Sequence, residues 1–268
     1  MKKLLSFALA ALMVLVCVFA FTSCGKKGKT LDEVKKAGEL VVATSPDFEP
    51  FEFLDGETVV GIEVEILEKI CEKLGVKLTL KQMDFDSVLP GVTAGKFDCG
   101  MSGITVTESR QKNMLFTDPY CLAAQAIVVK AGSAVKNKAD LSGKKVSAQS
   151  GTTAEEFCMG NGYEVLAFTA NSDAEQALLN DNVDAWVIDD LTAAAMVKEY
   201  NEGKADSEKL VILSEAMTTE PYAFAFAFGS ETLVEEINKI VKGLLDDGTI
   251  AGLFAKYEAP YTAPSSAK

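Results

Sequence analysis

The sequence contains no histidine among its 268 residues. Histidine is the most frequent metal ligand in proteins and the most frequent general acid or base near neutral pH. Its absence argues against zinc chemistry and against most hydrolytic mechanisms. We therefore predict no metal site, no cofactor and no catalytic residues.

Apolar runs long enough to approach a membrane span are also absent except at the N-terminus. Residues 4–21 are apolar apart from Ser6, two lysines precede them, and small residues lead into Cys24. This order is typical of a lipoprotein signal, in which residues 1–23 are removed and Cys24 is acylated with palmitate. A transmembrane anchor is the alternative, because the run is near the lower length limit for a span. We expect an extracytoplasmic protein held on the cell membrane by lipidated Cys24, with residues 24–37 as linker and leading helix.

Cysteines are few, and their spacing matches no metal motif. Four remain after Cys17 and Cys24: Cys71, Cys99, Cys121 and Cys158. An even number in an exported protein would allow disulfides. Since Cys71 and Cys99 lie in apolar segments, we favour free buried thiols.

Basic residues are outnumbered, with 26 Lys and Arg against 39 Asp and Glu, a net charge of −13. Residues 1–23 contain two lysines and no acid, so the mature chain would carry −15. Such a surface repels phosphates, which argues against a nucleic-acid partner.

A strand–helix–strand–helix–strand pattern occurs twice. The first copy has strands expected at 39–43, 76–80 and 97–101 and helices at 62–74 and 86–94; the second has strands at 143–148, 165–168 and 183–188 and helices at 153–159 and 173–179. This pattern predicts an α/β fold of two lobes, each a mostly parallel sheet flanked by helices.

Two extended apolar runs, residues 123–130 and 222–228, connect the two copies, and helices at 231–245 and up to residue 257 follow. We predict lobe 1 from residues 38–123 and 217–258 and lobe 2 from residues 124–216. A two-strand hinge would let the lobes close. Residues 259–268 are expected to form a polar, frayed tail.

Candidate binding residues follow the predicted strands, where open α/β sheets bind ligands. Arg110 lies in the first turn of a helix, where a cation opposes the helix dipole. A bound carboxylate would explain it, since arginine grips carboxylates in a bidentate manner. The alternative is a surface arginine paired with Glu108 or Asp118. Thr105 can supply a hydroxyl beside it.

The second lobe offers a matching loop and a carboxylate. Thr152 and Glu155 fit a capping box, and the free amides near Thr153 form an anion site; a simple helix cap is the alternative. Asp189 ends a strand and is placed to receive a cation, although it or Asp190 is equally suited to cap the next helix.

Phe48 and Phe85 could contact the aliphatic part of a ligand side chain; the alternative is that both pack in the core. An arginine on one lobe and a carboxylate on the other match the two charges of an α-amino acid. A closed cleft that pairs both charges leaves no buried ion unmatched.

These features resemble the polar amino acid-binding proteins of ABC importers, solute-binding protein family 3, with the type II periplasmic-binding-protein fold. The resemblance covers residues 31–257 and rests on eight segments in order: PFEF (50–53), GIEVEI (61–66), GITVTESR (103–110), FTDPY (116–120), DLSGKKV (140–146), SGT (150–152), VDAWVID (183–189) and DGT (247–249).

The resemblance implies a role for each candidate residue. Arg110, with Thr105 and the amides near Thr152 and Thr153, would hold the ligand carboxylate. The ammonium would lie at Asp189, near the backbone of Ser102 and Gly103, and Phe48 and Phe85 would cover the side chain. Gln149 is a further candidate for ligand contact. The implied partners are an amino acid and an ABC transporter permease, and we expect a monomer.

The sequence departs from the family pattern in three places. Ser45 replaces an aspartate that meets the ligand side chain in several relatives, Gln149 stands where the glutamine-binding type has lysine, and Gly61-Ile-Glu replaces Gly-Phe-Asp. The change at residue 45 favours a polar uncharged ligand over a cationic one, unless Asp47 or Glu49 compensates. A dehydratase of cyclohexadienyl acids and a ligand-sensing module remain the alternative functions.

Overall fold

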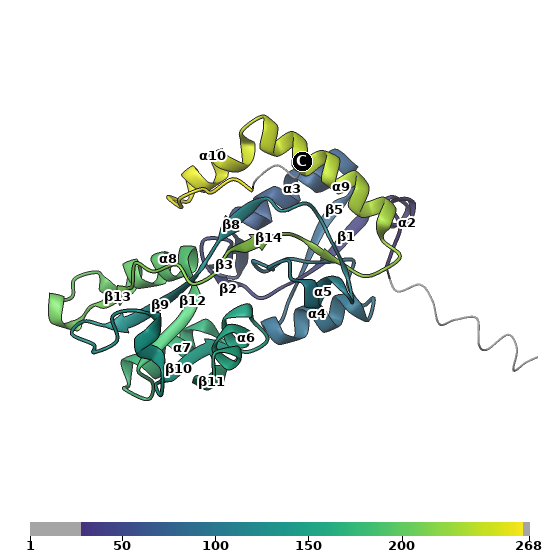
Figure 1. Ribbon diagram of the computed structural model, residues 1–268. Coiled ribbons are helices and arrows are strands. Elements are labelled where there is room, and N and C mark those ends of the chain that lie inside the picture. Colours follow the sequence, from purple (N-terminus) through teal and green to yellow (C-terminus); the bar gives the residue numbers. More distant parts are fainter. Residues whose placement is uncertain (1–27, 265–268) are drawn as a thin grey trace, which may run out of the picture.

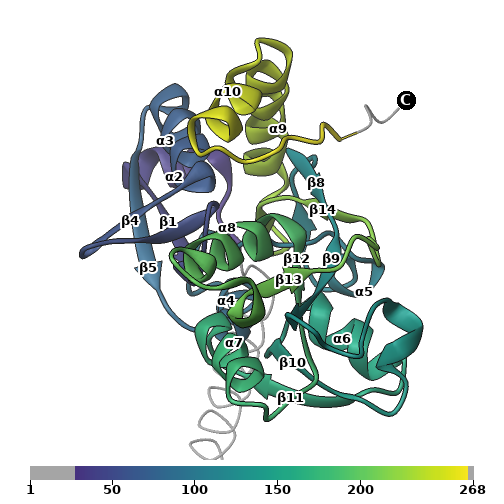
Figure 2. The same cartoon turned by 90° about the vertical axis from the view of Figure 1, so that its left-hand side faces the viewer.

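The computed structural model describes residues 28–264, so the predicted signal peptide and Cys24 lie outside the described residues. The structure has two sheet-containing lobes, one at the lower left and one at the right of Figure 1. In the view of Figure 2, α3, α9 and α10 lie in the upper lobe and α6, α7 and α8 in the lower lobe. The predicted two-lobed α/β architecture is confirmed.

Lobe 1 contains a five-stranded sheet of order β5-β1-β6-β15-β7, in which β1 is parallel to β5 and β6 and only β15 runs the opposite way. Its strands are β1 (Glu39–Thr44), β5 (Lys77–Gln82), β6 (Cys99–Gly100), β7 (Leu115–Phe116) and β15 (Ala225–Phe226). A small antiparallel sheet adds β2 (Asp47–Phe48), β3 (Glu52–Asp55) and β4 (Thr58–Val60).

The helices of lobe 1 cover both faces of its main sheet. They are α2 (Leu31–Ala37), α3 (Ile62–Leu74), α4 (Phe85–Thr93), α5 (Glu108–Gln111), α9 (Glu231–Asp246) and α10 (Thr249–Lys256). Side chains alternate along β1: Leu40 and Val42 pack in the core with α3, α9 and α10, whereas Ala43 packs in the core with α4. This period of two follows from the pleat of a strand.

Lobe 2 repeats the arrangement with sheet order β11-β10-β12-β9-β13, in which only β9 is antiparallel to its neighbours. The strands are β9 (Gln125–Lys130), β10 (Lys145–Gln149), β11 (Glu164–Phe168), β12 (Ala185–Asp189) and β13 (Leu210–Ile212). The helices are α6 (Thr153–Gly160), α7 (Asn171–Leu179), α8 (Asp190–Asn201) and two short 3-10 turns, Lys138–Leu141 and Asp206–Glu208. Trp186 is buried against one face and Val187 against the other.

The lobes are joined by β8 (Cys121–Ala123) and β14 (Glu220–Tyr222), which pair antiparallel. They run side by side between the lobes (Figure 1). The predicted hinge runs begin in the connection, at Ala123 of β8 and Tyr222 of β14, but continue into the two sheets: β9 makes up most of 123–130, and β15 forms part of 222–228. A central strand buried on both faces is a continuous apolar run, so apolar length alone does not separate these strands from the connection that precedes them.

Three other predictions differ from the structure. The strand expected at 97–101 is only Cys99–Gly100, and α8 was not predicted, because its alanine-rich sequence has little amphipathic contrast. The frayed tail is wrong up to Thr262. Its carbonyl accepts the N–H of Leu122 on the hinge at 3.0 Å, and the Tyr261 hydroxyl donates to the Tyr120 carbonyl at 3.2 Å.

The four cysteines of the described chain, Cys71, Cys99, Cys121 and Cys158, are buried and free, as predicted. Within residues 28–264, no helix combines the length and the apolarity that a membrane span requires.

Candidate functional site

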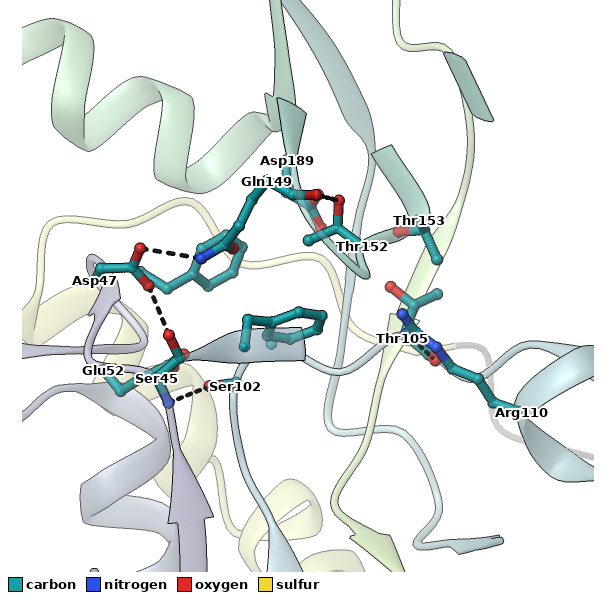
Figure 3. Close-up of a pocket in the computed structure, with 13 residues that line it drawn as sticks. Ser45, Asp47, Glu52, Ser102, Thr105, Arg110, Gln149, Thr152, Thr153 and Asp189 are labelled. Atoms are coloured by element: carbon teal, nitrogen blue, oxygen red, sulfur yellow. Dashed lines mark hydrogen bonds between the residues drawn. The ribbon is translucent and has the colours of Figure 1, made fainter. Parts of the chain in front are cut away.

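One cavity between the lobes is lined by all ten residues that the sequence singled out. It encloses about 320 Å³ of space, part of it open to solvent, and its lining also includes Ser45, Asp47 and Glu52 (Figure 3). Lobe 1 contributes Phe48, Phe85, Ser102, Gly103, Thr105 and Arg110, and lobe 2 contributes Gln149, Thr152, Thr153 and Asp189. The two sets meet because the carboxyl ends of both parallel sheets face the gap.

Arg110 is held by carbonyl groups rather than by a carboxylate. Its guanidinium donates to the carbonyl of Thr105 at 3.0 Å and, across the gap, to that of Gly151 at 3.2 Å. The side chain is almost wholly buried, and burial lowers the pKa of Arg110 below its ordinary value. Among the described residues no carboxylate lies within salt-bridge distance of it, so the predicted alternative, a pair with Glu108 or Asp118, is not observed.

Within residues 28–264 no carboxylate therefore contacts the guanidinium, although the charges of Glu156, Glu220 and Asp189 act on it from farther away. A guanidinium has five N–H donors, and the carbonyl contacts occupy only part of them. A carboxylate in the cavity would complete a charge-assisted, bidentate contact.

The N-terminus of α6 lies opposite and offers backbone amides. Thr152 caps this helix by accepting the Glu155 N–H at 3.2 Å, while the Glu155 carboxylate accepts the N–H of Gly151 at 2.7 Å instead of that of the cap residue. The predicted capping box is thus only half formed. The first amides of a helix have no intrahelical acceptor and favour an anion, so this end of α6 complements Arg110.

Asp189 ends β12, and its carboxylate accepts hydrogen bonds from the Tyr222 hydroxyl and the Gln125 side-chain amide. Burial, reinforced by nearby Glu220, raises the pKa of Asp189 to about 7. Asp189 makes no side-chain cap for α8, whereas Asp190 accepts the Leu191 N–H. The capping alternative for the Asp189 side chain is therefore not observed.

Two aromatic rings line the cavity from lobe 1. Phe48 lies 5.7 Å from the ring of Phe51, and Phe85 also packs in the core around α4. Gly103 has φ of +53°, and a Cβ there would lie 2.4 Å from the Phe48 ring. Only glycine therefore allows Phe48 to lie this close to the loop after β6.

Ser102 and Gly103 hold neighbouring parts of the site in place. The Ser102 hydroxyl accepts the N–H of Ser45 at 2.8 Å, and the Gly103 N–H donates to Glu63 at 2.9 Å. The Gly103 N–H and one acceptor site of the Ser102 hydroxyl are thus engaged within lobe 1. On lobe 2, the Thr153 hydroxyl accepts from Gln125 at 3.2 Å.

The sequence reasoning missed Glu52, although it lies inside the PFEF segment. Its side chain is fully buried at the cavity wall, and burial next to Glu63 raises the pKa of Glu52 well above its ordinary value. An acid between two phenylalanines was the available signal. Of the two acids proposed to compensate for Ser45, Asp47 lines the cavity and Glu49 lines a separate groove.

No cluster of three or more potential metal-ligating side chains occurs within residues 28–264. The cavity presents the guanidinium of Arg110, the carboxyl groups of Asp47 and Glu52 on lobe 1 and of Asp189 on lobe 2, and aromatic and polar walls between them. This arrangement suits a small zwitterion.

Comparison with known proteins agrees with the geometry. The model of bacterial extracellular solute-binding proteins, family 3, matches residues 40–260. The arginine-binding extracellular protein ArtP of Bacillus subtilis (strain 168) is 32% identical over 251 residues, which cover 92% of this chain and 96% of that protein. The L-cystine-binding protein TcyJ of Escherichia coli (strain K12) is 29% identical over 232 residues, 85% of each chain.

Solved structures extend the similarity to the fold. A mutant of ArgBP from T. maritima has a TM-score of 0.78 and 37% identity, covering 85% of this chain and 98% of that chain. An ancestral arginine-binding protein, solved with arginine and with glutamine, gives a TM-score of 0.76 in both structures at 38% and 39% identity, covering 82% of this chain and 98% and 97% of those chains.

The similar structure that bears on the enzyme alternative is also that of a binding protein. AncCDT-1, described as a precursor of cyclohexadienyl dehydratase, is itself an ancestral amino acid-binding protein; it has a TM-score of 0.77 and 33% identity, covering 85% of this chain and 99% of that chain. The relatives named here are solute-binding proteins and not enzymes. With the family model matching most of its length, this chain belongs to the bacterial extracellular solute-binding proteins, family 3.

Proposed function

We propose that this protein captures one polar L-amino acid between its lobes and delivers it to an ABC importer. The observation that carries the proposal is that one cavity is lined by two buried groups of opposite charge: the guanidinium of Arg110 on lobe 1 and the carboxylate of Asp189 on lobe 2. The ligand carboxylate would lie between Arg110 and the amides at the start of α6. Its ammonium would lie at Asp189, so that each buried charge gains a partner.

The ligand side chain would extend between Phe48 and Phe85 toward Glu52 and Gln149. This end of the cavity is polar, which supports a side chain that forms hydrogen bonds. A protonated Glu52 suits an uncharged side chain, whereas an ionised Glu52 suits a cation, as the arginine-binding relatives would suggest.

A lipid anchor would keep the protein close to a membrane importer. The basic, apolar and small residues that lead to Cys24 support a lipid anchor, and the family is extracellular. We propose that the mature chain begins at acylated Cys24 and acts as a monomer. Metabolic labelling with palmitate should mark the wild type but not Cys24→Ala.

A thermal-shift screen of the twenty amino acids tests the proposal. A ligand at a hundred times its Kd stabilises the native state by about 2.7 kcal/mol, which is a shift of several degrees. A larger shift with L-glutamine would indicate a site for an uncharged side chain, and a larger shift with L-arginine a site for a cationic one. The proposal fails if none of the twenty amino acids raises the melting temperature.

A further inference from the structure

One contact between the lobes involves neither Arg110 nor Asp189. Asp47 lies in β2 of lobe 1, and its Oδ2 accepts three hydrogen bonds from lobe 2: from the backbone N–H of Asn171 at 2.9 Å, from Nε2 of Gln149 at 3.0 Å and from Nδ2 of Asn171 at 3.5 Å. Its Oδ1 accepts the Ser45 hydroxyl at 3.1 Å within lobe 1. Figure 3 shows Asp47 and Gln149 facing each other beside the cavity.

The helix that receives Asp47 lacks a cap of its own. The cap position of α7 is Ala170, which has no side chain able to accept a hydrogen bond, and the N–H of Asn171 is the first amide of the helix. Such an amide needs an external acceptor, and a carboxylate near a helix N-terminus also gains from the helix dipole. Asp47 provides this cap from the opposite lobe.

The cap can form only when the lobes are closed. Asp47 is largely buried; burial raises its pKa, and the hydrogen bonds from Asn171, Ser45 and Gln149 act in the opposite direction. Rotation about β8 and β14 would separate β2 from α7, returning Asp47 to water and leaving α7 uncapped. Both carboxylate oxygens of Asp47 are engaged by protein donors in this closed form.

We propose that Asp47 is an interlobe latch: by capping α7 and binding Gln149, it stabilises the closed form and sets how long any captured ligand is retained. The link to retention rests on the proposed function. The link to closure does not, because all the groups that make the latch belong to the protein.

Asp47→Ala tests the latch, with Asp55→Ala as the matched control. Asp55 is an exposed acid at the end of β3 in the same small sheet, so its removal changes the charge equally but breaks no contact between lobes. Small-angle X-ray scattering of the ligand-free proteins should give a larger radius of gyration for Asp47→Ala than for the wild type or Asp55→Ala. An unchanged radius overturns the proposal.

Dissociation kinetics of L-arginine and L-glutamine separate a latch from a specificity residue. The latch predicts that Asp47→Ala raises the dissociation rate about tenfold for each of these amino acids that the wild type binds, with less than a twofold change in association rate. An increase confined to L-arginine would make Asp47 a reader of the side chain and overturn the proposal. If the wild type binds neither, a thermal-shift screen that is also negative rejects the proposed function, while the scattering still decides the latch.

A second variant tests whether Asp47 acts only by capping α7 and not by holding the lobes together. Ala170→Asp in the Asp47→Ala background supplies α7 with a cap from its own chain. This double variant should regain thermal stability but keep the larger radius of gyration. Recovery of the wild-type radius would show that Asp47 acts only as a cap for folding. The effects of Asp47→Ala and Gln149→Ala on the dissociation rate should also not multiply in the double variant, because both substitutions remove the same contact.

Discussion

Capture of an amino acid should release a proton at pH 6 and almost none at pH 8. In the ligand-free closed cavity, burial raises the pKa of Asp189 to about 7. An ammonium in contact with this carboxylate would favour its ionised form. Binding at a pH below 7 therefore displaces a proton, whereas at pH 8 the carboxylate is already ionised.

The size of the effect follows from the ordinary value of 3.8 and the raised value of about 7. That difference corresponds to a cost of roughly 4 kcal/mol for ionising Asp189 in the empty cavity. If the ammonium removes this cost, the release is about 0.9 proton at pH 6, about 0.5 at pH 7 and about 0.1 at pH 8. The apparent Kd should be about tenfold lower at pH 8 than at pH 6 by the same linkage.

Isothermal titration calorimetry in phosphate and in Tris measures the release, because the two buffers differ in their heat of ionisation. Asp189→Asn keeps the shape of the side chain and should abolish the buffer dependence as well as weaken binding. Glu175, whose pKa burial also raises to about 7, does not line the cavity and is retained in this control. Equal heats in both buffers at pH 6 would refute the role assigned to Asp189.

Three further outcomes are expected. Arg110→Ala should weaken ligand binding by roughly 2–5 kcal/mol, because the ligand carboxylate loses its buried partner; calorimetry that finds near-wild-type affinity contradicts this. Gly103→Ala places a Cβ 2.4 Å from the Phe48 ring at a φ of +53°, so it should lower stability by about 1–3 kcal/mol in urea unfolding; an unchanged midpoint argues against the strain. Asp189 and Glu175 have raised pKa values, so the native state binds more protons than the unfolded state between about pH 4 and pH 7. Their contribution to the free energy of unfolding of the ligand-free protein therefore falls as pH rises through that window. Asp189→Asn should flatten the dependence of melting temperature on pH.

The candidate site was predictable because its residues follow strands. Parallel strands end at one edge of a sheet, so Arg110 and Asp189 were expected near the ligand before any packing was known. Glu52, Tyr222 and Gln125 were missed for a common reason. No local pattern marks any of them, because the importance of each comes from a side chain that tertiary packing brings beside it.

The hinge shows the same limit. The apolar pattern identified two extended crossings between the copies, but the strands that connect the lobes, β8 and β14, precede the longest apolar runs. An apolar run indicates that a strand is buried on both faces, but it does not indicate which sheet the strand joins. The C-terminal residues likewise read as a polar tail, yet Tyr261 and Thr262 bind the hinge.

The sequence by itself determined the two α/β lobes, the edge at which each presents its polar residues, and the types of charge available there. These depend on the repeat of apolar side chains and on signals within a few residues of each other, which are local properties. Only the tertiary structure decided that Arg110 lacks a carboxylate partner, that Tyr222 reaches Asp189, and that Asp47 caps a helix of the other lobe. Those contacts depend on the angle at which two separately packed bodies meet, and no local pattern encodes that angle.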